Sequence, residues 1–173
     1  TDDINSTLQA ASHETEFSQA RHQFFFAPGT YGSPDGADDP LTATDVVNSE
    51  LGYYQVVSGL GASPEDVTLN GSIHVEPVRT CEPNPWDCQA PGSLTRFWRS
   101  LSNMTINPIQ QPVGEDAERP FPSGVTEAHQ MRYAVSQAAP LRRMNITGGL
   151  TVFGRVGEYA SGGYMANSRV SGT

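Results

Sequence analysis

Short apolar runs interrupted by glycine dominate the C-terminal part of the chain, residues 133–170. Apolar and polar residues alternate in runs such as Met144–Ile146 and Leu150–Phe153, which predict strands of five residues or fewer. Gly148–Gly149 and Gly162–Gly163 separate these runs and allow tight bends. Because this stretch has no helical periodicity and no hairpin signal between paired runs, the pattern predicts a parallel coil of strands, a β-helix.

The beginning of the chain has a different pattern and predicts a helix. Ile4, Leu8 and Ala11 fall on one helical face, and Asp2 or Asp3 can cap its start. We expect residues 1–21 to form a helix that covers the open end of the coil and shields its unpaired strand edges. We expect residues 22–173 to form an incomplete parallel β-helix domain.

Further strands are predicted between these two regions, and together they indicate an all-β fold. The phrases VTLNG, MTINP and MNITG recur along the chain, each as a short strand that ends near a corner. Their irregular spacing is typical of coil turns with inserted loops. The predicted strands are His22–Phe26, Tyr54–Val57, Val67–Gly71, Ile73–Val75 and Met104–Asn107, and a one-turn helix is predicted at Ser63–Asp66.

Composition narrows the classes of protein that fit. The 173 residues suit a single core, and the 17 Gly and 13 Pro favour a loop-rich β protein over a helical bundle. The net charge is −9 and every basic residue is Arg, so a nucleic-acid binder, which needs a basic face, is not expected. No apolar run reaches about 18 residues, so no membrane partner is expected. The first residues look like the start of a trimmed chain rather than a translation start.

Cysteines and glycosylation sequons both suggest a secreted protein. Cys81 and Cys88 bracket a six-residue loop, and a disulfide there requires an oxidising compartment. No further Cys or nearby His completes a metal site, so no metal or other cofactor is expected. Four asparagines begin N-x-S/T sequons, although the same pattern also suits entry into strands of a β-coil. These candidate glycosylation sites are Asn5, Asn70, Asn103 and Asn145.

Several long phrases resemble a known family. APGTYG, LGYYQVVSGLGASPEDVTLNG, FWRSLSNMTI, YAVSQAAPLRRMNI and YASGGYMANSRVSG look like successive segments of glycoside hydrolase family 55, the secreted exo-acting β-1,3-glucanases. The resemblance runs from about Phe24 to the C-terminus. It implies a right-handed parallel β-helix, of which this chain is the N-terminal part of the first of two. It also implies a β-1,3-glucan substrate and an inverting mechanism.

The resemblance also implies roles for particular residues. Gln137 in the SQAAP phrase and Ser161 in the ASGG phrase are expected to hold the water that attacks the sugar. A carboxamide and a hydroxyl each donate and accept hydrogen bonds, so they can orient a water without acting as strong bases. From the residues alone, the favoured interpretation is structural: Gln137 caps a coil corner and Ser161 fits a tight turn. The resemblance favours the catalytic role instead.

The catalytic acid of the family has no match in this chain. Glu158 precedes Ser161 closely and is a candidate for lining the same cleft, and Tyr159 is a candidate for stacking on a sugar ring. Glu127 and Asp87 are interpreted as solvated loop charges, Trp98 as a core residue, and Asn167 as a corner residue.

Two functions from different classes follow. In the first, the chain is part of a secreted β-1,3-glucan hydrolase, and the remainder of the enzyme is a partner that supplies the acid. In the second, it is a non-catalytic structural or self-assembling β-coil, with copies of itself as partners and at most the capacity to bind glucan.

Overall fold

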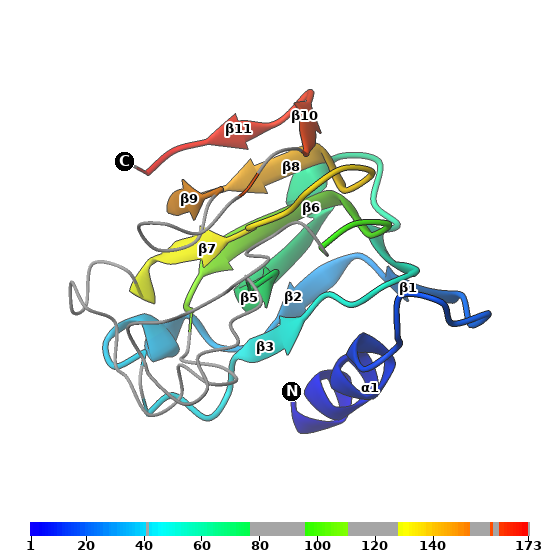
Figure 1. The fold of residues 1–173 in the computed structure, drawn as a ribbon. Helices are drawn as coiled ribbons and strands as arrows, with labels where there is room; N and C mark the ends of the chain where they lie inside the picture. The colour runs from blue at the N-terminus through cyan, green and yellow to red at the C-terminus, as the bar shows by residue number, and fades with distance from the viewer. Residues whose placement is uncertain (41, 77–95, 111–127, 153–159, 161–162, 173) are drawn as a thin grey trace, which may run out of the picture.

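Parallel strands stacked on one another form the body of the molecule. The computed structural model describes residues 1–40, 42–76, 96–110, 128–152, 160 and 163–172. All strand pairs among these residues are parallel. Most of the regular structure is strand, which confirms the all-β prediction. Helix α1 (Asp2–Ser12) and strands β10 and β11 lie at opposite ends of the stack (Figure 1).

The strands divide into three stacks, and the chain visits these stacks repeatedly in the same order (Figure 1). The first stack contains β1 (His22–Phe26), β4 (Gln55–Gly59), the starts of β6 (Ser100–Pro108) and β8 (Pro140–Ile146), and β10 (Tyr164–Ala166). The second contains β2 (Gly29–Tyr31), the start of β5 (Val67–His74), the ends of β6 and β8, and β11 (Arg169–Val170). The third contains β3 (Val47–Glu50), the end of β5, β7 (Gln130–Arg132) and β9 (Gly149–Thr151).

Apolar side chains at matching positions of successive strands build the core. In the second stack Leu69 pairs with Ile106 and Ile106 with Ile146, and all three are fully buried. Val57, Leu101 and Leu141 form a similar buried column in the first stack. Each column removes apolar surface from water at every strand, which stabilises the stack at about 25 cal/mol per Å² of apolar surface buried.

The corners between stacks repeat in register, and several of them use a left-handed backbone. Tyr54, Trp98 and Ala138 precede first-stack strands, with φ of 56°, 55° and 54°. A second set of left-handed residues lies between the first and second stacks. Its members are Asn103, Arg143 and Asn167, with φ of 55°, 53° and 51°. The prediction that Asn167 is a corner residue is therefore confirmed. Left-handed conformations are uncommon for non-glycine residues, so their alignment reflects a bend that each turn of the chain must make.

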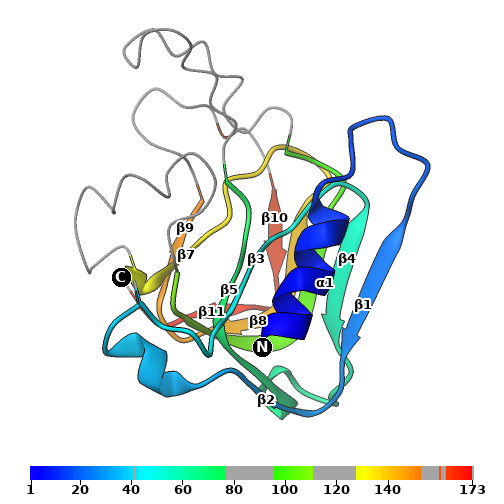
Figure 2. The same ribbon diagram turned by 90° about the horizontal axis from the view of Figure 1, so that it is seen from below.

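Helix α1 is shorter than predicted. It ends at Ser12, so the expectation of a helix through residue 21 is wrong for the residues that follow. Leu8 and Ala11 are buried, but Phe17 is 86% exposed, so the apolar stripe that packs the helix does not continue. Figure 2 shows α1 in front of the stacked strands, at the end that carries β1 and β3.

Most predicted strands are confirmed, with changes in their limits. Val67–Gly71 and Ile73–Val75, predicted as two strands, form the single bent strand β5, with Val75 in an isolated bridge to Tyr133. The predicted one-turn helix is the 3₁₀ helix η2 (Pro64–Asp66), and a second, η1, spans Pro34–Ala37.

Candidate functional site

Gln137 lies at an exposed corner before strand β8. It follows the buried Ser136 and precedes Ala138, whose backbone is left-handed. The Ser136 amide donates to the Arg96 carbonyl at 2.8 Å, and the Arg99 amide donates to the Ala138 carbonyl at 3.2 Å. Gln137 is therefore held on the corner formed by residues 96–99, and its carboxamide is accessible to a ligand.

The other residues expected at this site lie outside the described residues. These are Ser161, Glu158 and Tyr159, together with the loop carboxylates Glu127 and Asp87. The predicted disulfide partners Cys81 and Cys88 also lie outside them. Of the expected site residues, the structure therefore places Gln137.

Aromatic rings occupy the corners that precede the Gln137 corner in the stack. Tyr54 and Trp98 are stacked, with ring centroids 5.2 Å apart and an angle of 27° between the planes. Tyr53 and Phe97 meet edge to face at 5.3 Å. Trp98 is 47% exposed, so its interpretation as a core residue is wrong. The rings form an aromatic surface on the same side of the coil as Gln137.

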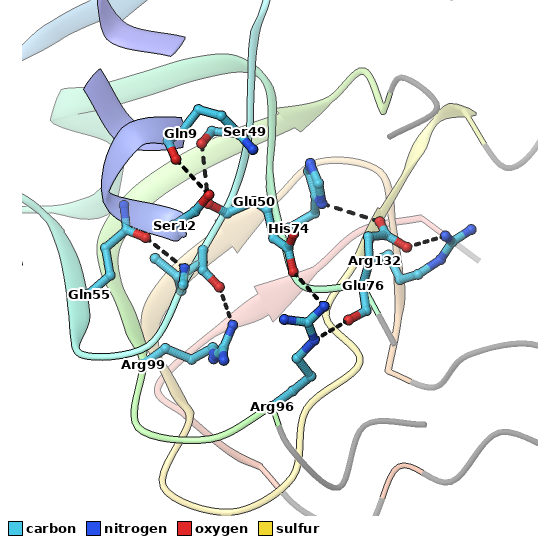
Figure 3. A network of polar contacts seen from close by, with 12 residues as sticks. Gln9, Ser12, Ser49, Glu50, Gln55, His74, Glu76, Arg96, Arg99 and Arg132 are labelled. Atoms are coloured by element: carbon cyan, nitrogen blue, oxygen red, sulfur yellow. Dashed lines mark hydrogen bonds and ion pairs between the residues drawn. The ribbon is translucent and has the colours of Figure 1, made fainter. Parts of the chain in front are cut away.

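A buried network of charged residues lies beside this corner (Figure 3). Arg96 Nη2 lies 3.1 Å from Glu50 Oε1, and Arg96 Nε donates to the Glu76 carbonyl at 2.7 Å. The Glu76 carboxylate also pairs with Arg132, and His74 Nδ1 lies 3.2 Å from it. These residues come from β3, the β5–β7 region and the corner at 96–99, so the network ties three turns of the chain together.

The electrostatics of the network favour ionised Glu76. Burial alone raises the pKa of this carboxyl, but the hydrogen bond from His74 and the charge of Arg132 together hold it below its usual value. Glu76 and Glu50 therefore act as counter-ions of arginines. Neither is free to serve as the acid of a glycosidase.

Arg99 is the most unusual charge in this region. Its side chain is 1% exposed, and burial lowers its pKa to about 10, with a further contribution from Arg96. Its Nη1 donates to the Leu51 carbonyl, whereas Nη2 has no hydrogen-bond partner among the described residues. Burial also raises the pKa of the neighbouring Tyr133. Ionisable groups perturbed in this way concentrate at functional sites, although structural networks perturb them as well.

Sequence reasoning missed this network because its members are far apart in the chain. No sequence motif marks His74, Glu50 and Glu76 as members of one site. One signal was available: every basic residue is Arg, and Arg suits buried ion pairs better than Lys because of its planar fork of donors.

The sequon asparagines bind other parts of the protein. Asn70 is 4% exposed, its Nδ2 donates to the Gly32 carbonyl at 3.0 Å, and its Oδ1 accepts from Asn107. Asn103 Nδ2 donates to the carbonyls of Gly59 and Gly61. A glycan on Asn70 would have to displace these contacts, so the geometry opposes glycosylation there and favours the structural interpretation.

The remaining two sequons are also engaged. Asn145 Nδ2 donates to Thr105 Oγ1 at 3.3 Å, and Asn5 Nδ2 donates to the Val46 carbonyl at 3.0 Å. Their glycosylation stays a prediction, and any glycan there would compete with these bonds.

Metal sites and membrane-spanning helices are both absent from the described residues. Within these ranges, no group of three or more His, Cys, Asp or Glu side chains is arranged to hold a metal ion. Among the same residues, no helix combines the length and apolar character needed to cross a membrane.

The site therefore belongs to a protein of stacked parallel strands, with a carboxamide and aromatic rings exposed on one corner. No family model matches the chain. An exo-beta-1,3-glucanase of Streptomyces sp. (strain SirexAA-E / ActE) is 33% identical over 158 residues, which are 91% of this chain and 19% of the relative. The structure of sacteLam55A from Streptomyces sp. SirexAA-E matches with a TM-score of 0.67 and 30% identity, over 98% of this chain and 24% of that one.

These matches confirm the resemblance to glycoside hydrolase family 55 that the sequence phrases indicated. The similarity extends over nearly the whole chain, which spans about a fifth of the length of the curated relative.

Proposed function

We propose that this chain is part of a secreted β-1,3-glucan hydrolase that inverts the configuration of the sugar. The observation that carries the proposal is the exposed carboxamide of Gln137, held on a rigid corner within a chain that is 33% identical to an exo-beta-1,3-glucanase. We further propose that the three stacks form a right-handed parallel β-helix and that α1 caps its first turn.

In this mechanism Gln137 and Ser161 position the nucleophilic water. Ser161 precedes Tyr164 by three residues, as Gln137 precedes Pro140, and Tyr164 and Pro140 are partners in register. This equal spacing in the sequence supports the same role for Ser161 as for Gln137. The catalytic acid lies outside this chain, and an inverting reaction requires it roughly 6.5–9.5 Å from the base to leave room for the water.

The remaining assignments are parts of the same proposal. Glu158 and Tyr159 line the glucan site, Cys81 and Cys88 form a disulfide, and the enzyme acts outside the cell. The partner that completes the site is the rest of the same enzyme.

The test is hydrolysis of laminarin by the polypeptide that contains this chain and the remainder of the enzyme. Gln137→Ala should lower kcat about 100-fold or more, because the water loses its orientation. The control is Gln23→Ala, which removes the same group from the exposed side of β1 and should leave kcat unchanged.

Proton NMR of the first product should show the α-anomer of glucose. An initial β-anomer or full activity of Gln137→Ala would contradict the mechanism.

A non-catalytic coil is the second candidate. It is favoured by the pairing of Glu50 and Glu76 with arginines, which leaves neither carboxylate free beside the Gln137 corner. Mass spectrometry of the undigested natural protein distinguishes the two candidates: a single species near 18.6 kDa supports the non-catalytic coil, whereas a larger species supports the enzyme.

A further inference from the structure

Trp98 occupies a strained and partly exposed position that packing of the core does not require. Its φ is 55°, in the left-handed region that bulky residues rarely adopt. Such backbone strain costs about 1–3 kcal/mol and persists where the surrounding structure enforces it, often at binding sites. Nearly half of the side chain is nevertheless open to solvent. An apolar ring held in this way stabilises the fold less than a buried one would.

The indole ring is supported from two sides. Tyr54 stacks on it at 5.2 Å, and Phe97 meets it edge to face at 4.9 Å with an angle of 82°. Tyr54 is itself fixed, since the guanidinium of Arg21 lies 3.7 Å from its ring centroid and its hydroxyl donates to the Glu16 carbonyl. Two successive contacts thus anchor Trp98, and a rigid ring loses little conformational freedom when a ligand binds.

At the next corner in the stack, the described residue that follows Trp98 has a small side chain. Ala138 follows Trp98 in register, as Trp98 follows Tyr54, and a methyl group cannot cover an indole face. The exposed Gln137 immediately precedes Ala138. An apolar ring surface therefore borders a polar carboxamide, an arrangement that matches a sugar ring with an apolar C–H face and hydroxyl groups at its edge.

We propose that Trp98, supported by Tyr54 and Phe97, is a stacking platform for a glucosyl ring of a β-1,3-glucan chain bound beside Gln137. The proposal rests on the proposed function for the identity of the sugar. Its own content is the position of the subsite, on the aromatic corner formed by Tyr54, Phe97 and Trp98.

The chain offers a direct spectroscopic test. The 173 residues contain two tryptophans, Trp86 and Trp98, so within this stretch of sequence Trp86→Phe leaves Trp98 as the single reporter. Titration of this variant with laminaritriose and laminarihexaose should shift the tryptophan emission to shorter wavelength, and calorimetry should give the same dissociation constant. Trp98→Asn, chosen because Asn tolerates a left-handed backbone, should weaken binding about tenfold, whereas Trp98→Phe should restore part of it.

The control variant is Phe25→Ala, which removes a ring that is 54% exposed on β1, outside the aromatic corner. Its affinity should equal that of the parent. If calorimetry detects the oligosaccharide but Trp98→Asn binds as tightly as the parent, the platform is wrong and the proposed function is untouched. If the parent binds no oligosaccharide, the platform is also wrong, and the laminarin assay decides the proposed function separately.

Discussion

Single residues with left-handed backbones determine where each turn of the chain bends. The glycine pattern correctly indicated the bend at Gly148–Gly149, but the aligned corners are formed by residues such as Tyr54, Trp98 and Ala138. Propensity does not predict these positions, because their conformation is imposed by the corners stacked above and below them. The exposure of Gln137 and Trp98 follows from the same corners, so it too could not be predicted from local sequence.

Among the described glycines, Gly71 leaves the least room for a side chain. Its φ is +139°, and an added Cβ would lie 1.9 Å from the Val47 carbonyl oxygen. We expect Gly71→Ala to lower the free energy of unfolding by about 3 kcal/mol or more, since strain and a backbone clash combine. Urea unfolding followed by circular dichroism measures the change.

The matched comparison is Gly29→Ala. Gly29 has a similar φ of +152°, but an added Cβ would meet nothing within 4 Å. This variant should lose less stability than Gly71→Ala, and the difference isolates the clash with Val47. Equal losses in the two variants would show that close approach of the strands is not what requires glycine at position 71.

Individual strands were predicted more accurately than the contacts between elements. The bounds of His22–Phe26 were correct to the residue because its run of phenylalanines is a local signal, but the strand is not buried throughout, since Phe25 is 54% exposed. The end of α1 was not, because its length depends on the strands that Leu8 and Ala11 pack against. The buried charge network joins residues from several turns, and nothing near any one of them in the sequence reveals its partners.

The Glu76 ion pair should make the stability of the stacked elements depend on acid. The pKa of Glu76 is lower in the folded protein than in the unfolded chain, so the stability it contributes is present above about pH 4.5. This stability is lost as the pH falls through the folded pKa. We expect Glu76→Gln to lower the free energy of unfolding at pH 7 by about 3–5 kcal/mol, because the substitution removes the charged member of a buried ion pair.

Thermal unfolding from pH 7 to pH 3 tests this expectation. The unfolding temperature of the parent should fall steeply below about pH 4.5, and the slope for Glu76→Gln should be shallower in the same range. The control is Asp38→Asn, which removes an exposed carboxylate outside the network and should keep the steep slope of the parent. Parallel slopes for the parent and Glu76→Gln would mean that groups other than Glu76 account for the acid dependence.

The whole molecule is a stack whose turns contact only their neighbours, and such a stack is vulnerable at its ends. Strand β3 lies at the end covered by α1, where exposed backbone groups would otherwise invite pairing with another chain. The structural match includes 98% of the chain and supports the fold of stacked parallel strands. The sequence indicated a helix near the N-terminus, but not its contacts with the residues around β3.

Asn5 of helix α1 forms hydrogen bonds with the backbone at the exposed edge of the stack. Its Nδ2 donates to the Val46 carbonyl at 3.0 Å, and its Oδ1 accepts from the Asn48 amide at 2.8 Å, so one side chain replaces a neighbouring strand. We expect Asn5→Ala to lower the free energy of unfolding by about 1–3 kcal/mol, because two backbone groups lose their partners. We also expect it to increase self-association, which sedimentation velocity would detect. The control is Ser6→Ala, next to it on the exposed side of α1. If Asn5→Ala is less stable but stays as monomeric as Ser6→Ala, the helix stabilises the first turn without protecting its edge from other chains.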